Sequence, residues 1–272
     1  MVPGIRKYPR TRHVEGSRLQ PGDQDLDAVP WRDVRGKHLA VEEKIDGANC
    51  ALSFDEAGKL LLQSRGHYLT GGAREKHFAA LKPWAQAHAS SFFEVLRERY
   101  VMYGEWVYAK HTVYYDALPH YFLEFDVLDR TTGDFLSTPR RRSLLAGLPV
   151  VSVPVLHEGS LRTLEELVAL VGPSRFKTPD WRERLGKEAR ELALDAERIA
   201  AETDPSSEME GLYIKVEDDH RVIDRLKWVR HGFLTSVVDS GTHWLARPIV
   251  PNRLAGNASL DRLFEPSSAR RS

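Results

Sequence analysis

Residues 43–49 read Glu-Lys-Ile-Asp-Gly-Ala-Asn, and this heptapeptide decides how the rest of the chain is interpreted. Lys44 follows an apolar and then acidic run, and it stands two residues before the pair Asp46-Gly47. A lysine amine can act as a nucleophile when desolvation or a nearby cation lowers its pKa. Attack on the α-phosphate of a nucleotide would split one difficult phosphoryl transfer into two easier ones. Glycine at position 47 would let the backbone pass close to that nucleotide.

The acidic residues around Lys44 fit the same chemistry. Glu43 and Asp46 could orient the lysine or the water shell of a Mg²⁺ ion, which keeps much of its hydration in proteins. Such a short string also occurs by chance in a surface turn after a strand. The order of signals along the rest of the chain must therefore decide between the two interpretations.

Five further short segments follow Lys44, and most of them combine an apolar, strand-like run with charged residues. They are Ser64-Arg65-Gly66, Tyr103-Gly104-Glu105-Trp106, the run from Phe122 to Asp129, the run from Glu210 to Lys215, and Arg225-Leu226-Lys227. Each segment alone is weak evidence, whereas six in a set order are specific together.

This order resembles the covalent nucleotidyltransferases, the superfamily of polynucleotide ligases and mRNA capping enzymes, over roughly residues 35–232. Asn49, two residues after Gly47, is similar to an asparagine of the RNA ligases in this superfamily. The opening Lys7-Tyr8-Pro9 also resembles the leader of RNA-ligase-type sequences. On this resemblance the chain is expected to belong to the ATP-dependent RNA ligases.

The resemblance implies roles for particular residues. Lys44 would be the nucleophile, with Asp46, Glu210 and Lys227 as the other catalytic residues. Glu105 would bind the ribose, and Phe125 would stack on the purine. The full set expected to bind the nucleotide is Glu43, Lys44, Ile45, Asn49, Arg65, Glu105, Phe125, Lys215, Arg225 and Lys227.

The same resemblance assigns the other ligands. Asn49 and Arg65 would hold the 5′-phosphate of the RNA, while Glu210 and Asp46 would bind Mg²⁺ or Mn²⁺, in part through water. Position 225 departs from the family pattern, because it holds arginine where lysine is usual. Arginine keeps the charge, but it is a rigid fork that stays protonated, which distinguishes it from the lysine of the family pattern.

The implied activity is the joining of 3′-hydroxyl and 5′-phosphate RNA ends through a lysyl-AMP and an RNA-adenylate, in RNA repair. Three alternatives stay open: a DNA ligase or strand joiner, a GTP-dependent capping-type transferase, and an inactive module that binds RNA. The 43 residues before Lys44 are too few for the domain that holds nicotinamide in NAD-dependent ligases, so ATP is preferred.

Composition agrees with this interpretation without deciding it. Lys plus Arg and Asp plus Glu both number 39, so an RNA-binding surface would have to be a local basic patch. The single cysteine, Cys50, excludes an intramolecular disulfide. No run approaches the ~20 apolar residues of a membrane span. The start of the sequence lacks the apolar stretch of a signal peptide, and we expect a cytoplasmic protein without a membrane partner.

The pattern of elements predicts an α+β fold with largely antiparallel sheets and flanking helices around a nucleotide cleft, as in an ATP-grasp-like nucleotidyltransferase domain. We expect an extended leader at 1–34 packed on the domain, a catalytic domain at 35–232, and a short extension at 233–272. That extension is too short for a five-stranded OB-fold. A partner, for example an end-healing kinase or phosphatase, would then help to grip the RNA.

Individual segments carry local predictions. A hairpin turning at residues 56–58 should bring Lys44 and Arg65 to one cleft, and helical spacing over 74–100 should break near Pro83. Ser137 or Thr138 should cap a helix, and the arginines at 140–142 should form its solvated start. Residues 181–203 predict one long charged helix, and a closing hairpin should turn at Asp218-Asp219.

Overall fold

The computed structural model describes residues 4–19, 27–233 and 248–257. The strands in these ranges are β1 (Arg12–His13), β2 (Leu39–Glu43), β3 (Ala48–Phe54), β4 (Leu60–Ser64), β5 (Tyr100–Trp106), β6 (Phe122–Asp129), β7 (Phe135–Leu136), β8 (Val151–Ser152), β9 (Val155–Gly159), β10 (Gly211–Glu217) and β11 (Arg221–Val229). The α-helices are α1 (Leu81–Ala87), α2 (Ala89–Leu96), α3 (Thr138–Leu145), α4 (Leu164–Val168), α5 (Trp181–Glu191) and α6 (Ala196–Ala201). Short 3-10 turns are η1 (Trp31–Asp33), η2 (Ala73–Phe78) and η4 (Ala255–Asn257).

The strands connect in the order β4-β3-β5-β6-β7-β11-β10-β2-β9, with β1 beside β11 and β8 beside β6. All neighbouring strands in the main path are antiparallel. Strand β1 pairs in parallel with β11, and β8 pairs in parallel with β6. Helices flank this largely antiparallel sheet, so the predicted fold class is confirmed.

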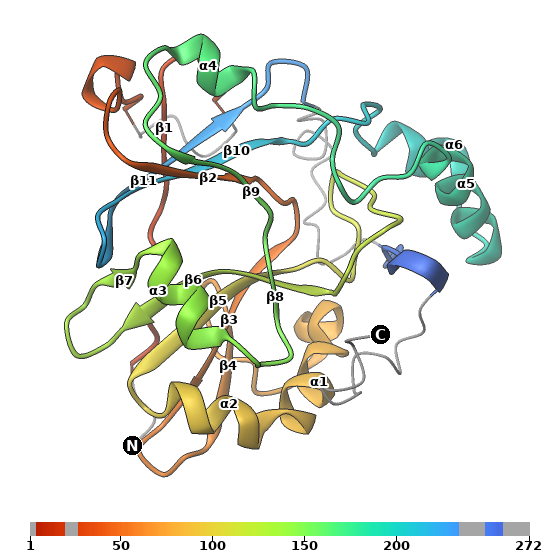
Figure 1. The fold of residues 1–272 in the computed structure, drawn as a ribbon. Coiled ribbons are helices and arrows are strands. Elements are labelled where there is room, and N and C mark those ends of the chain that lie inside the picture. Colours follow the sequence, from red (N-terminus) through yellow and green to blue (C-terminus); the bar gives the residue numbers. More distant parts are fainter. Residues whose placement is uncertain (1–3, 20–26, 234–247, 258–272) are drawn as a thin grey trace.

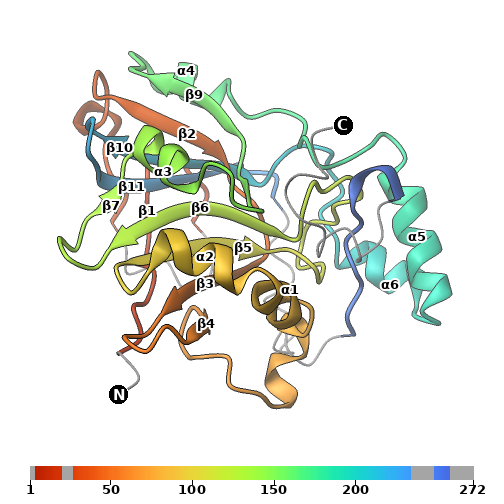
Figure 2. The same cartoon turned by 60° about the horizontal axis from the view of Figure 1, so that its bottom comes forward.

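The sheet is divided into two groups of strands, which face each other (Figures 1 and 2). One group holds β2, β9, β10 and β11, and the other holds β3, β4, β5 and β6. The short strand β7 joins them, because Phe135 pairs with both Leu128 of β6 and Val222 of β11. Segments far apart in the sequence are thereby brought to one cleft between the groups.

Strand β2 shows how the chain encodes this arrangement. Its five residues, Leu39–Glu43, are all buried, and the strand lies between β10 and β9. The continuous apolar run before the two glutamates agrees with a strand that is covered on both faces. The predicted hairpin between β3 and β4 is present, with Phe54 opposite Leu60. However, β2 lies in the other group of strands, so Lys44 and Arg65 approach the cleft from opposite sides.

The helices differ from the predictions in their boundaries. The predicted break near Pro83 is absent, since Pro83 lies in the first turn of α1, two residues after its start. Proline is tolerated there because it removes no intrahelical hydrogen bond. The region 181–203 forms two helices, α5 and α6, separated where Ala193 adopts a positive φ of 52°. Helix α3 has Ser137 at its N-cap, but the Ser137 hydroxyl donates to the Asp219 carbonyl instead of capping the helix.

The leader lies against both groups of strands. Val14, Val29, Trp31 and Val34 are buried in a hydrophobic cluster with residues of β2, β10 and β11. A separate, larger cluster fills the space between the β3–β6 group and helices α1 and α2. Among the described residues, no helix combines the length and apolar character needed to cross a bilayer. Most of the predicted extension at 233–272 lies outside the described residues.

Candidate active site

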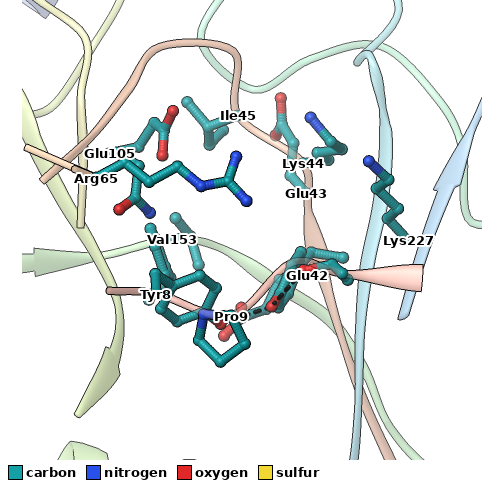
Figure 3. Close-up of a pocket in the computed structure, with 14 residues that line it drawn as sticks. Tyr8, Pro9, Glu42, Glu43, Lys44, Ile45, Arg65, Glu105, Val153 and Lys227 are labelled. Carbon is teal, nitrogen blue, oxygen red and sulfur yellow. Dashed lines mark hydrogen bonds between the residues drawn. The ribbon is translucent and has the colours of Figure 1, made fainter. Parts of the chain in front are cut away.

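A pocket of about 230 Å³ opens between the two groups of strands (Figure 3). Residues from both groups and from the leader line it. They are Tyr8, Pro9, Thr11, Glu42, Glu43, Lys44, Ile45, Asn49, Arg65, Glu105, Phe125, Val153, Tyr213 and Lys227. Eight of the residues predicted from the sequence to bind the nucleotide are among these: Glu43, Lys44, Ile45, Asn49, Arg65, Glu105, Phe125 and Lys227.

Lys44 stands where β2 ends and the chain enters the loop to β3. Its backbone N–H donates to the Gly211 carbonyl at 3.0 Å, which ties this loop to the start of β10. The Lys44 Nζ donates to Glu210 Oε1 at 2.6 Å. The lysine side chain is 21% exposed, whereas the Glu210 side chain is 2% exposed. The amine is therefore held in place by a buried carboxylate and still reaches the pocket.

The charge of Lys44 is set by competing effects. Burial lowers the pKa of its amine, but Glu210, Asp46 and Glu105 favour the ammonium form, and the net pKa is raised. A nucleophilic amine must be neutral, so the carboxylates keep this lysine in its resting state. Added positive charge near Lys44 would lower its pKa and favour the neutral, reactive amine.

Asp46 organises the neighbouring loop. Its Oδ2 accepts the backbone N–H groups of Thr112 and Val113, both at 2.7 Å, and its own N–H donates to the Tyr115 hydroxyl at 2.9 Å. Burial is the main reason that the pKa of its carboxyl is raised, with the backbone hydrogen bonds and Lys44 acting in the opposite direction. One oxygen of Asp46 is therefore committed to the protein itself.

Glycine is required at two positions beside Lys44, but for packing. A Cβ on Gly47 would lie 2.7 Å from the Val107 side chain and 2.9 Å from the Trp106 carbonyl oxygen. A Cβ on Gly211 would lie 2.0 Å from the Trp228 carbonyl oxygen. The glycine of the Asp46-Gly47 pair thus lets the loop pack against β5, a reason different from the close nucleotide approach that the sequence suggested.

Glu105 faces the same group of charges from β5. It lies opposite Asn49 in the register of β3 and β5. Burial raises the pKa of Glu105 to about 8, and the nearby carboxylates of Asp46 and Glu210 add to this, while Lys44 opposes it. Protonation of Glu105 near neutral pH limits the repulsion among the carboxylates around Lys44.

The other predicted residues of the pocket have distinct settings. Glu43 is buried, and its Oε1 accepts the Ser174 hydroxyl at 2.6 Å. Arg65 is exposed and extends from the end of β4 toward Lys44 across the pocket (Figure 3). Lys227 of β11 lies on the Lys44 side (Figure 3). Cations from both groups of strands therefore converge on one space, an arrangement suited to phosphate groups.

Phe125 is half-buried on the wall formed by β6. Its ring centroid lies 5.1 Å from that of Tyr8, nearly perpendicular, and 6.2 Å from that of Tyr213. The alternation along β6 turns Phe125 toward the pocket and its neighbours Glu124 and Asp126 into the buried interior.

Lys215 and Arg225 have surroundings other than those predicted, since neither lines the pocket. The Lys215 side chain is 1% exposed, and its Nζ donates to Glu42 Oε1 at 3.0 Å and to the Phe125 carbonyl oxygen. Arg225 donates through Nε to Asp126 Oδ2 at 3.0 Å. Both cations form ion pairs with buried carboxylates, and in this structure they pack behind the residues that line the pocket.

Arg141 completes this buried network and corrects an expectation about the arginine run. The arginines at 140–142 were expected to be a solvated helix start, but the Arg141 side chain is 0% exposed. Its Nη2 donates to Glu42 Oε1 at 2.7 Å, and its Nη1 lies 3.3 Å from Glu124 Oε1. The helix α3 places one of the three arginines inward, which a charge run in the sequence does not reveal.

Several pocket residues were not predicted as site residues. Tyr8, Pro9 and Thr11 belong to the leader, and the other three come from β2, the segment after β8, and β10. The signal for Tyr8 and Pro9 was present in the Lys7-Tyr8-Pro9 resemblance. No comparable signal marked the others, because the pairing of β2 with β10 places Glu42 and Tyr213 at this surface and Val153 reaches it from the segment after β8.

A divalent cation would need donors beside Lys44. Within the described ranges, no cluster of three or more His, Cys, Asp or Glu side chains has metal-binding geometry. The carboxylates of Glu210 and Asp46 nevertheless both act on the Lys44 charge. Mg²⁺ binds through one or two carboxylates together with waters and substrate phosphates, so the residues fit a hydrated ion and not an all-protein cage.

Comparison with known proteins shows to which family the chain belongs. A family model described as RNA ligase matches residues 37–229. The chain belongs to the RNA ligase family. The matched range contains the first and last predicted motifs, Lys44 and Lys227, together with every motif between them. No protein of curated function matches the sequence.

Solved structures of RNA ligases share this fold. The Naegleria gruberi RNA ligase with PPi is 19% identical, covers 86% of this chain and 58% of its own, and has a TM-score of 0.52. A mutant of the same ligase with AMP and Mn is 17% identical, with 84% and 57% covered and a TM-score of 0.52. A mutant with ATP and Mn is 18% identical, with the same coverage and a TM-score of 0.51.

This RNA ligase family chain thus spans less than three fifths of the length of those solved chains. At such low identity the likeness concerns the fold. The chemistry must therefore be argued from the residues of this pocket.

Proposed function

We propose that this chain is an ATP-dependent RNA ligase that joins 3′-hydroxyl and 5′-phosphate RNA ends. The observation that carries the proposal is the Lys44 amine, held 2.6 Å from a buried Glu210 at the edge of a pocket lined by Arg65, Glu105 and Lys227. Membership of the RNA ligase family supports RNA as the substrate. ATP is supported by the solved relatives of this fold that hold ATP or AMP.

The reaction would begin on the Lys44 amine. The Lys44 ammonium would first give up a proton to solvent. The neutral amine then attacks the α-phosphorus of ATP, an N–P bond forms, and the bond to the bridging β-phosphate oxygen breaks, so that pyrophosphate leaves and the nitrogen gives up a second proton. Lys227 and Arg65 supply positive charge on opposite sides of the pocket, where it would stabilise charge that develops on the phosphates. Phe125 would pack on the purine, and Glu105 would accept from the ribose hydroxyls.

Two further transfers would complete the ligation. An oxygen of the RNA 5′-phosphate attacks the lysyl-AMP and releases the Lys44 amine, which gives an RNA-adenylate. The RNA 3′-hydroxyl then attacks the 5′-phosphate, and AMP leaves. Arg65 and Asn49 line the pocket on the β3–β4 side and would hold the 5′-phosphate through these steps.

The resting charge of Lys44 sets a condition for the first step. Mg²⁺ or Mn²⁺ held at Glu210 and Asp46 would offset the carboxylates that favour the ammonium form and would stabilise charge on the phosphates. The proposal assigns Lys215 and Arg225 a supporting role behind the pocket wall, because buried carboxylates already use their charges.

Lysyl-AMP formation is tested by intact-mass spectrometry of the purified protein, before and after incubation with ATP, GTP or NAD⁺ and Mg²⁺. We expect an AMP adduct with ATP. Lys44→Ala should lack it, and Lys37→Ala, a matched change at an exposed lysine before β2, should keep it. A GMP adduct would instead identify a capping-type transferase. No adduct under any of these conditions would contradict the proposal and favour a module that only binds RNA.

The acceptor is tested separately with nicked duplexes of RNA and of DNA. We expect sealing of RNA nicks that carry 3′-hydroxyl and 5′-phosphate ends, and much slower sealing of DNA. Equal rates would favour the DNA ligase alternative. A role in RNA repair predicts that 5′-hydroxyl ends are joined only after a kinase has phosphorylated them, which would make an end-healing enzyme the natural partner.

A further inference from the structure

Residues 6–14 of the leader form a strap that spans the two groups of strands. At one end, the Arg6 carbonyl oxygen accepts hydrogen bonds from Gln63 of β4 and Tyr103 of β5, both at 2.8 Å. At the other end, β1 pairs in parallel with β11, and the Val14 N–H donates to the Lys227 carbonyl at 3.0 Å. The strap is therefore fixed to both walls of the pocket.

The middle of the strap enters the pocket. Tyr8, Pro9 and Thr11 line it, and Tyr8 is buried while its neighbour Lys7 is exposed. In Figure 3, Tyr8 and Pro9 lie beside Glu42 on the side of the pocket away from Ile45 and Glu105. All three residues precede the range matched by the family model, which begins at residue 37.

Tyr8 makes two kinds of contact with the wall that carries Phe125. Its hydroxyl donates to Asp126 Oδ2 at 2.5 Å, and Asp126 is the residue after Phe125. Because one hydroxyl has one proton, the Tyr213 hydroxyl donates to Tyr8 at 2.5 Å. The Tyr8 ring also meets the Phe125 ring edge-on, with centroids 5.1 Å apart. Tyr8 thus contacts both the Phe125 ring and Asp126, the next residue along β6.

We propose that Tyr8 is a positioning residue for the purine of the nucleotide, acting by fixing Phe125 on the pocket wall. This rests on the proposed function. The leader strap would then be part of the nucleotide site, so that affinity for an adenine nucleotide depends on a segment outside the matched family range.

The charges around Asp126 support this role. Burial disfavours the Asp126 carboxylate, but Lys215, Arg225, Arg141 and the hydrogen bond from Tyr8 together lower its pKa, so it remains an acceptor. Burial raises the pKa of the Tyr8 hydroxyl well above its ordinary value, so it remains a donor. The bond between them therefore persists over the neutral pH range. Lys215 also donates to the Phe125 carbonyl oxygen, so the β6 wall is held from both sides.

The experiment measures nucleotide binding by calorimetry, using Tyr8→Phe, which keeps the ring and removes the bond to Asp126. All proteins carry Lys44→Met, so that binding is measured without reaction. Tyr121→Phe is the matched control, because it removes another tyrosine hydroxyl bond, to the Asn252 carbonyl at 2.8 Å, away from the pocket. The probes are ATP and inorganic tripolyphosphate, which lacks the base.

We expect Tyr8→Phe to weaken ATP binding about three- to tenfold, the usual effect of one lost hydrogen bond. Binding of tripolyphosphate and the behaviour of Tyr121→Phe should match the Lys44→Met parent. Equal weakening of ATP and tripolyphosphate would show a general structural effect and would overturn the proposal. Unchanged ATP binding in Tyr8→Phe would overturn it as well.

A double-mutant cycle with Phe125→Leu tests the route of the effect. If Tyr8 acts through Phe125, Tyr8→Phe should cost little further ATP affinity once Phe125 has been replaced. A full additive loss would contradict the proposed route. If the Lys44→Met parent binds no ATP while wild type forms no AMP adduct, the proposed function itself fails. An AMP adduct in wild type with unchanged affinity in Tyr8→Phe would leave that function standing and reject only the role of Tyr8.

Discussion

Two clusters of charged residues lie next to each other in this molecule and differ in what their charges are used for. At the pocket, Lys44 is partly exposed and pairs with Glu210. Behind the pocket wall, Arg141 and Lys215 are both at most 1% exposed, and both pair with Glu42, which is 0% exposed. The pocket cluster leaves the Lys44 side chain within reach of a ligand. The buried cluster leaves no room for a ligand.

The difference follows from the partners that face each residue and not from residue type. Arg225 and Lys227 stand two apart on β11, yet only Lys227 lines the pocket. Arg225 instead meets Asp126 and lies over the Phe135 ring, 3.6 Å from its centroid. A basic residue within a motif can thus serve either the ligand or the wall, and the buried carboxylates that face it decide which.

The largest expected effect concerns the pocket cluster. Lys44→Ala should abolish the AMP adduct, because it removes the nucleophile, while the protein remains folded at the assay temperature. Intact-mass spectrometry and circular dichroism measure the two properties. A retained adduct in a folded Lys44→Ala protein would break the comparison, since another group would then carry the chemistry.

The next effect concerns the buried cluster. Arg141→Ala should destabilise the protein by about 3–5 kcal/mol, because it leaves Glu42 and Glu124 buried without their main partner. Urea unfolding monitored by tryptophan fluorescence gives the free energy. Arg140→Ala, on an exposed position of the same helix, is the matched control and should cost under ~0.5 kcal/mol. Similar losses for both arginines would be inconsistent with a buried role for Arg141.

A smaller and sharper contrast compares neighbours on β11. Lys227→Ala should slow lysyl-AMP formation by about 10²–10³-fold with little change in stability, as expected for the loss of one charge-stabilising group. Arg225→Ala should mainly lower the free energy of unfolding, because it removes a partner of buried Asp126. Single-turnover kinetics and urea unfolding of both variants give the two values. The reverse pattern would return Arg225 to the phosphate-binding role that its motif suggested.

The smallest effect is a pH dependence at Glu105. Its pKa is raised from 4.5 to about 8, so the native state holds this proton more tightly than the unfolded state. The resulting stability is fully present below about pH 4.5 and is lost as pH rises through about 8. Glu105→Gln, which cannot ionise, should therefore gain thermal stability relative to wild type as pH rises across this window. Parallel melting curves for the two proteins from pH 5 to 8 would contradict the raised pKa.

The sequence allowed the family and the fold class to be predicted, and the family match and the antiparallel sheet confirm both. Short motifs sufficed because Lys44, Glu105 and Lys227 each stand within or beside a strand-like run that carries apolar residues. The hairpin from β10 to β11 was also predictable, since the turn at Asp218-Asp219 interrupts two alternating runs. The roles of these motif residues in catalysis and binding stay predictions.

Only the tertiary structure decided which charged residues share the pocket. The resemblance placed Lys215 and Arg225 with the nucleotide, and the charge run suggested that Arg141 lies in solvent. In the structure Lys215 and Arg141 pair with Glu42, and Arg225 pairs with Asp126, carboxylates at least 99 residues away in the chain. The inclusion of Tyr8 from the leader depends on the pairing of β1 with β11 in the same way. Local sequence sets which residues form a strand, whereas burial of a charge depends on long-range partners that no short motif contains.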